Sequence, residues 1–253
     1  DHGPIISDLL PPFARTGEVV SLRWVGLEPT DELSVMARYA RTATVSEFRE
    51  QLRGWCCPTF NFVAGDQDGQ IGYQLTGRLP LRPVTECGYR SGAEAGHRWA
   101  GYIPFEHLPA SGEPPEGWLG SANNIVAVDW PYPLTGTWPS DYRMQRLVQA
   151  LNASPPLTAQ DMRALQYDAL SPRAVEWALP AVAALRSAGV DDPLLAEIEA
   201  WDRRYTRESR SAVVFESFFV AWARSVLTQR FPASLLSFLF PAAIGLVERL
   251  LVE

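Results

Sequence analysis

The chain has 253 residues, of which 47% are hydrophobic and 20% charged, as in folded globular proteins and unlike disordered ones. Its 22 basic and 29 acidic residues give a net charge of −7, so no basic excess is available for binding a nucleic-acid backbone. We therefore expect a globular protein of one large domain or two modest ones that does not bind nucleic acid.

The N-terminal part mixes short strand-like and helix-like patterns. The sequence opens with Asp1-His2-Gly3-Pro4 and has no initiator Met, so we expect a processed chain or a portion of a longer one. Residues 19–25 have the composition of a strand. Residues 31–39 and 46–55 predict short helices, because each begins near an Asp or Ser and carries acidic residues in its first turn.

A β-hairpin is the clearest local signal. Two strand-like runs, residues 61–66 and 70–75, are separated by Gln67-Asp68-Gly69, which has the residue types of a tight turn. Pro80 follows and cannot donate to a sheet ladder, so it indicates a sheet edge or the end of the ladder. Residues 118–128 predict a further strand.

From residue 140 onward the pattern is helical. Apolar positions at helical spacing and N-capping residues predict five helices: residues 141–151, a helix opening at Thr158, and residues 171–186, 193–205 and 212–229. The most apolar segment, residues 233–247, is shorter than the roughly 20 residues of a membrane helix and contains Pro241, so no membrane span is expected. A strand-rich part, residues 1–138, followed by a mostly helical part, residues 139–253, predicts an α+β fold.

Two adjacent asparagines, Asn123 and Asn124, lie in an otherwise apolar run. A carboxamide is costly to bury without partners, so an Asn at a strand end is either a turn former or a positioned hydrogen-bond donor. Fixed Asn donors serve in oxyanion holes, where they face the charge that develops in a transition state. The local sequence leaves both interpretations open.

A series of short motifs extends over roughly residues 1–220. In order they are Asp1-His2-Gly3-Pro4-Ile5-Ile6, Leu22-Arg23-Trp24, Asn61-Phe62-Val63-Ala64-Gly65-Asp66, Asp68-Gly69-Gln70-Ile71-Gly72-Tyr73, Gly77-Arg78-Leu79-Pro80-Leu81-Arg82, Gly101-Tyr102-Ile103-Pro104-Phe105, Ala122-Asn123-Asn124, Tyr142-Arg143-Met144-Gln145-Arg146-Leu147 and Gln166-Tyr167-Asp168-Ala169-Leu170-Ser171. The series resembles the penicillin acylase family of N-terminal-nucleophile (Ntn) amidohydrolases. Each motif is weakly specific, and their order carries the resemblance.

The resemblance implies that residues 1–138 are part of an Ntn-hydrolase αββα sandwich. It also implies that the chain is an internal piece of the large chain of a secreted, self-cleaving precursor with a periplasmic or extracellular location. The expected partners are a small-molecule amide substrate and the rest of the precursor, namely the small chain and the N-terminal part of the large chain. In such enzymes an N-terminal Ser hydroxyl attacks the amide carbonyl, and its own α-amino group is the general base.

The resemblance also assigns two site residues. Asn123 becomes the side-chain donor of the oxyanion hole, and Arg143 orients this Asn and the α-amino group. Arg143 lies in the first turn of a predicted helix, where the helix dipole does not favour a cation, so a specific partner is preferred to the alternative of a surface ion pair. Asn124 is expected to make structural hydrogen bonds to the backbone.

Two features depart from the family pattern. Residue 1 is Asp1, which cannot replace an N-terminal hydroxyl, so the nucleophile and the backbone part of the oxyanion hole are expected outside this sequence. Some family members bind calcium shortly after the Asn pair, but here Asp129 is the only carboxylate before Asp141. We therefore expect no cofactor, with calcium possible by resemblance and without an evident ligand set.

Two other functions remain as alternatives. The chain could belong to a non-catalytic binding or scaffold protein that keeps the fold. It could also be an unrelated α+β enzyme that uses Asp66 and Asp68 as acid and base, although Asp is expected beside a hairpin turn for conformational reasons.

The remaining reactive residues have weaker patterns. Cys56 and Cys57 could be a redox pair, but there is no CxxC motif, and with Cys87 they form no disulfide framework or zinc spacing, so packing is expected. The three histidines lack metal-ligand spacing, and turn or surface roles are expected for them; they are His2, His97 and His107. The tryptophans are expected to be core or loop anchors rather than the lining of an acyl pocket; they are Trp24, Trp55, Trp99, Trp118, Trp130 and Trp138.

Overall fold

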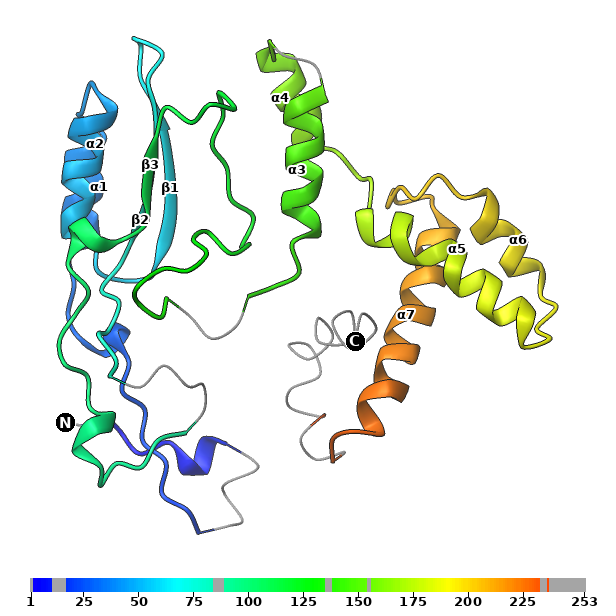
Figure 1. Cartoon of the computed structure of the whole chain (residues 1–253), viewed down its shortest axis with the longest axis horizontal. Helices are drawn as coiled ribbons and strands as arrows, with labels where there is room; N and C mark the ends of the chain where they lie inside the picture. The colour runs from blue at the N-terminus through cyan, green and yellow to red at the C-terminus, as the bar shows by residue number, and fades with distance from the viewer. Residues whose placement is uncertain are drawn as a thin grey trace. The chain divides into compact units, whose positions relative to one another are not determined.

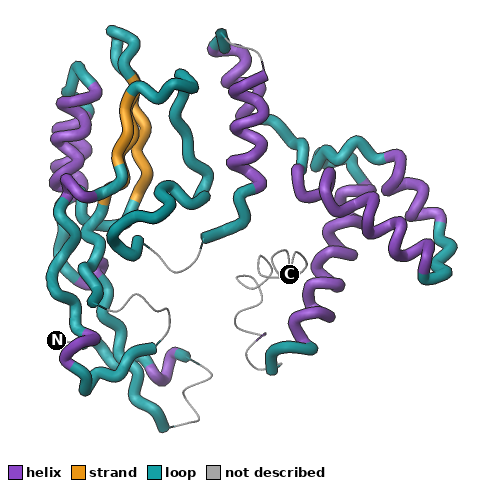
Figure 2. The backbone as a smooth tube through the Cα atoms, in the orientation of Figure 1, coloured by secondary structure: helices purple, strands orange, loops and turns teal. Residues whose placement is uncertain are grey.

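The computed structural model describes residues 2–10, 17–83, 89–134, 138–153, 156–232 and 236. It divides into two compact units, Asp1–Trp138 and Pro139–Glu253. The first combines helices with a small antiparallel sheet, and the described part of the second contains helices (Figures 1 and 2). The predicted α+β class is confirmed, while membership of an αββα sandwich stays a prediction. Cys87 and nearly all of the segment 233–247 lie outside the described residues.

The sheet of the first unit has three antiparallel strands in the order β1-β2-β3. The predicted hairpin is confirmed: β1 (Phe60–Gly65) pairs with β2 (Ile71–Thr76), and Gly69 has a φ of +83° in the connecting turn. A third strand, β3 (Ala110–Gly112), pairs with the other edge of β2. Pro80 makes only an isolated bridge to Tyr102, so the ladder has ended there as expected.

Two helices lie beside this sheet (Figure 1). In α1 (Glu32–Tyr39) the side chain of Asp31 caps the first turn, and in α2 (Val45–Gln51) Thr44 and Glu47 form a capping box. Edge-to-face aromatic contacts join both helices to β1; the rings belong to Tyr39, Phe48 and Phe62. The unit also contains single 3-10 turns: η1 (Ser7–Leu9), η2 (Val25–Leu27), η3 (Leu52–Gly54), η4 (Ala95–His97) and η5 (Phe105–His107).

Two predicted strands are wrong. Residues 19–25 form only an isolated bridge between Ile5 and Ser21 and then enter η2, so their backbone pairing is too short for a strand. Residues 118–128 form bends, and Asn123 has a φ of +63°, which a strand cannot accommodate. Leu119 and Val126 of this second segment pack against the hydrophobic cluster of the hairpin without joining its ladder.

The second unit contains five described helices, which are α3 (Tyr142–Ala153), α4 (Ala159–Gln166), α5 (Pro172–Ser187), α6 (Pro193–Ala200) and α7 (Arg210–Thr228). The N-cap side chains of α4 to α7 each accept a backbone N–H; they are Thr158, Ser171, Asp192 and Ser209. The helix predicted over residues 193–205 is too long, because α6 ends at Ala200 and Arg203 takes a φ of +65°.

The core of this unit lies between α5, α6 and α7. Its most buried side chains are Ala174, Ala178, Val182, Leu195, Ile198, Phe215 and Phe219. Among the described residues, α7 has the length and apolar composition of a membrane-crossing helix. Its buried residues recur every three or four positions, the pattern of a helix that packs one face against a core.

Candidate active-site residues

Asn123 lies in an irregular loop over the hairpin core. The loop is held by partly buried side chains that pack against Tyr73, Leu75, Leu79, Ile103 and Leu108; these side chains are Leu119, Val126, Tyr132 and Leu134. Ala122, immediately before Asn123, is also buried. The loop therefore rests on the sheet on both sides of the asparagine pair.

Asn123 and Asn124 have different roles in this loop. The Oδ1 atom of Asn124 accepts the N–H of Ala122 at 2.9 Å, and its Nδ2 donates to the carbonyl of Ile125 at 2.9 Å. Asn124 therefore has the structural role expected for it. Asn123 is exposed and holds the left-handed backbone conformation, which Asn tolerates better than most residues. The turn interpretation of Asn123 is confirmed by this conformation, whereas its role as a hydrogen-bond donor stays a prediction.

His107 ties the far end of the loop to the 3-10 turn η5. Its Nδ1 and the hydroxyl of Tyr132 share a hydrogen bond of 2.7 Å, and the two rings stack with centroids 5.7 Å apart. The indole N–H of Trp130 donates to the carbonyl of His107 at 3.0 Å. His107 therefore fastens the loop that carries Asn123, and Trp130 is a loop anchor as expected.

Arg143 lies in the first turn of α3 in the second unit, and its side chain is exposed. Its neighbour Tyr142 donates its hydroxyl to Glu176 at 2.8 Å and accepts the indole N–H of Trp177 at 2.8 Å. One turn further along, Arg146 donates to the carboxylate of Asp168. The pairing of Arg143 with Asn123 stays a prediction, because each residue is described within its own unit.

The sequence did not assign roles to Tyr142, Arg146 or Asp168, and it predicted only a turn or surface role for His107. Tyr142, Arg146 and Asp168 lie in the motifs 142–147 and 166–171, so membership of these motifs was the sequence feature that could have identified them. His107 had no such signal, because its partner Tyr132 is 25 residues away.

The carboxylate of Asp66 accepts hydrogen bonds from backbone N–H groups. Its Oδ1 accepts the N–H groups of Asp68 and Gln70 at 3.1 and 3.0 Å, and its Oδ2 accepts the N–H of Val45 at 3.2 Å. This carboxylate closes the hairpin turn and binds the start of α2, which accounts for Asp66 without an acid–base role.

The two described cysteines are free thiols. Burial raises the pKa of the Cys56 thiol, and the carboxylate of Glu32 accepts the backbone N–H groups of Cys56 and Cys57 at 3.1 and 2.8 Å. A raised pKa leaves little thiolate at neutral pH, which disfavours nucleophilic or redox chemistry.

The remaining candidates have structural contacts. His97 lies 3.4 Å from the carboxylate of Glu94 and bonds the carbonyl of Ser91. Trp55 is buried and packs against Phe60 and Phe62, as a core anchor does.

Within the ranges that the structure describes, no three side chains of His, Cys, Asp or Glu gather where they could hold a metal ion. Asp129 is exposed at a φ of +54°. Calcium takes six to eight oxygen ligands, which can include backbone carbonyls, so the expectation of no cofactor stays a prediction.

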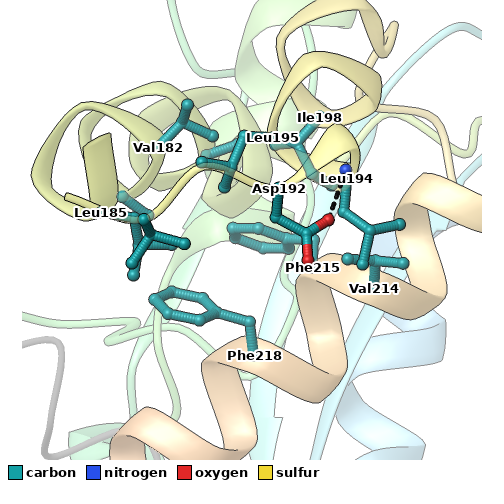
Figure 3. A pocket seen from close by; sticks show the side chains of 12 residues that line it. Val182, Leu185, Asp192, Leu194, Leu195, Ile198, Val214, Phe215 and Phe218 are labelled. Atoms are coloured by element: carbon teal, nitrogen blue, oxygen red, sulfur yellow. Dashed lines mark hydrogen bonds between the residues drawn. The ribbon is translucent and has the colours of Figure 1, made fainter.

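An apolar cavity of about 240 Å³ lies in the second unit, between α5, α6 and α7 (Figure 3). Val182, Leu195 and Phe218 contribute to its wall. Its one charged lining residue, Asp192, accepts the N–H of Leu194 at 2.8 Å as the N-cap of α6. The cavity thus has no polar group aimed at a ligand, so it is a space between packed helices rather than a candidate catalytic centre.

The sequence matches the family model described as penicillin amidase over residues 1–251. The chain belongs to the penicillin amidase family. This penicillin amidase chain is 34% identical over 234 residues to penicillin acylase 2 proenzyme of Pseudomonas sp. (strain SE83), covering 89% of the chain and 29% of that protein. It is 27% identical over 254 residues to acyl-homoserine lactone acylase QuiP of Pseudomonas aeruginosa, again covering 89% of the chain and 29% of the relative.

The fold comparison agrees with the family. Thermostable penicillin G acylase from Alcaligenes faecalis matches with a TM-score of 0.63 and 23% identity, over 80% of this penicillin amidase chain and 38% of that one. At this identity the match supports the fold alone. The chain spans 29% of the length of the two curated relatives above.

Proposed function

We propose that this chain is part of an acylase that hydrolyses the amide bond between an acyl group and an amine. In this proposal the Nδ2 group of Asn123 donates to the oxyanion of the tetrahedral intermediate, and Arg143 orients Asn123. The observation that carries it is the position of Asn123, an exposed residue at positive φ in a loop that packs on the sheet on both sides of it, within a chain of the penicillin amidase family.

The proposed chemistry divides between this chain and the rest of the precursor. An N-terminal Ser hydroxyl from another segment attacks the amide carbonyl carbon, and its proton passes to the Ser α-amino group. The carbonyl electrons move onto oxygen, which Asn123 and a backbone N–H stabilise. The C–N bond then breaks, the amine leaves with the proton, and water hydrolyses the acyl ester in a second, similar step.

The relatives' names narrow the substrate class. One relative is named for penicillin and the other for acyl-homoserine lactones. Both names describe acylases, so an acyl amide is the shared chemistry. The relative named a proenzyme supports a precursor that is processed, and a periplasmic or extracellular location is part of this proposal.

The test uses the full-length precursor that contains this chain, purified after processing. It is assayed with a chromogenic phenylacetyl amide and, separately, with N-acyl-homoserine lactones of several chain lengths. Hydrolysis of either supports the acylase, and the preferred acyl group defines the substrate. A well-folded product that hydrolyses neither and whose upstream sequence has no Ser or Cys at a cleavage junction would contradict it, and would favour a scaffold.

The role of Asn123 is tested by Asn123→Gly, which removes the donor and keeps a residue suited to positive φ. Loss of one oxyanion-hole donor lowers kcat by about 10² to 10³-fold. Asp129→Gly is the matched control, since Asp129 is exposed, lies in the same loop and has a φ of +54°. We expect the control to keep its kcat; equal losses in the two variants would mean that loop conformation, and not the Asn123 donor, is responsible.

A further inference from the structure

One carboxylate joins three separate segments of the second unit. Asp168 lies between α4 and α5, and its side chain is only 10% exposed. Its Oδ2 accepts from Nε of Arg146 on α3, and its Oδ1 accepts from Nη1 of Arg204, after α6, at 3.2 Å. Its Oδ1 also accepts the N–H of Leu170 at 3.2 Å. The side chain of Asp168 therefore links α3 to the loop before α5 and to the loop after α6.

The positive charges and hydrogen-bond donors around Asp168 stabilise its ionised carboxylate. Burial of Asp168 opposes its ionisation, but the hydrogen bonds from Arg146 and Leu170 and the charges of Arg146 and Arg204 outweigh it and hold its pKa below the usual value. A nearly buried carboxylate that lost these donors would be left uncompensated, which is strongly unfavourable.

A second anchor lies on the same face of α3. Tyr142 binds Glu176 and Trp177 of α5 through its hydroxyl. Tyr142 and Arg146 are four residues apart, so they lie one above the other on the helix. Together they fix both the position and the rotation of the first turn of α3. Arg143 stands between them in sequence with its side chain exposed, so its direction follows from these two anchors.

We infer that Asp168 is a positioning residue: through Arg146 it holds α3 in the rotation that aims Arg143. The inference rests on the proposed function, in which Arg143 orients Asn123. Arg146 and Asp168 each lie in a motif that carries the family resemblance, and the catalytic proposal uses neither residue. The positioning role gives both residues a function.

The test is a double-mutant cycle in the full-length processed enzyme with Asp168→Asn, Arg143→Gln and the double variant. If Asp168 acts through Arg143, Asp168→Asn lowers kcat about tenfold and leaves KM within about twofold. In the Arg143→Gln background the same substitution then has no further effect. A purely structural role would instead lower kcat by the same factor in both backgrounds, and that result would overturn the inference.

Two further variants keep the result interpretable. Glu199→Gln breaks the exposed ion pair with Arg186 in the same unit, at 2.8 Å, without touching α3, and is expected to leave kcat unchanged. If Asp168→Asn does not fold, Arg204→Gln replaces it in the cycle, because Arg204 is the more exposed partner of Asp168.

The outcomes separate this inference from the proposed function. An active wild type, a slow Arg143→Gln variant and an unaffected Asp168→Asn variant would refute the positioning role alone. A well-folded wild type that hydrolyses neither substrate and has no Ser or Cys at an upstream cleavage junction would refute the proposed function, and the positioning role with it.

Discussion

Arg203 is a buried cation that ends α6, and its replacement should weaken the second unit. The residue is 9% exposed, and within the described part of the chain its hydrogen-bond acceptors are main-chain carbonyls. Its guanidinium donates to the carbonyl of Ile198 at 2.7 Å and to that of Trp201, and lies 3.5 Å from the carbonyl of Glu199. These carbonyls are at the end of α6, where the helix dipole favours a cation.

The expected loss follows from these contacts. A hydrogen bond to a charged group contributes about 1.5–3 kcal/mol, and two close ones are lost in Arg203→Ala. Burial of the guanidinium opposes part of this gain and lowers the pKa of Arg203. A net loss of about 2–3 kcal/mol is therefore expected for Arg203→Ala. Because Arg203 has a φ of +65°, Arg203→Gly should be less harmful than Arg203→Ala by about 1 kcal/mol.

Hydrogen exchange of the backbone amides of α5, α6 and α7 measures this effect, since it reports the opening free energy of the second unit separately from the first. Arg186→Ala, which removes an exposed ion pair, is the control and should change this free energy by less than about 0.5 kcal/mol. An Arg203→Ala variant as stable as wild type, or Gly and Ala variants of equal stability, would refute the reasoning.

Three further predictions concern stability. The depressed pKa of Asp168 contributes stability that is present above its unfolded pKa, about 3.9, and is lost as the pH falls through its folded pKa. Asp168→Asn should abolish this contribution to the acid dependence of stability, measured by unfolding from pH 5 to about 2. Asn124→Ala should destabilise the loop by about 1–2 kcal/mol, measured by hydrogen exchange, because two hydrogen bonds between its side chain and the backbone are lost. Phe219→Ala should cost about 3–5 kcal/mol in denaturant unfolding, because its ring is almost fully buried.

The parts of the fold that the sequence predicts are those set by local chemistry. Asp66 and Gly69 determine the hairpin turn, one by binding N–H groups and the other by its positive φ. Thr44 with Glu47, and Thr158 with Asp161, form the capping boxes that start α2 and α4. Such signals lie within a few residues of the elements they specify.

The errors arise where tertiary contacts decide the conformation. Residues 118–128 have the composition of a strand, but Leu119 and Val126 pack on the hairpin core while Asn123 turns the backbone. Trp201 and Tyr205 continue the apolar spacing of α6, yet they pack ring against ring, with centroids 5.5 Å apart, beyond its end. The short strand β3 consists of Ala, Ser and Gly, which have little strand preference, and it forms because β2 offers an edge.

Part of the candidate site could be predicted from the sequence, and part of it could not. Asn123 could be singled out because an asparagine pair in an apolar run is unusual, and Arg143 because of its motif. The contacts of Asp168 join residues 22 and 36 positions away in the sequence, so only the folded chain reveals them.

A structure of the full-length enzyme with a covalent adduct on its nucleophile would test the proposed oxyanion hole most directly. A phenylmethylsulfonyl or boronate adduct places an oxygen where the oxyanion forms. If Asn123 is the oxyanion-hole donor, its Nδ2 lies about 2.7–3.1 Å from that oxygen. An adduct oxygen bound by other donors, with Asn123 beyond hydrogen-bond reach, would contradict the account.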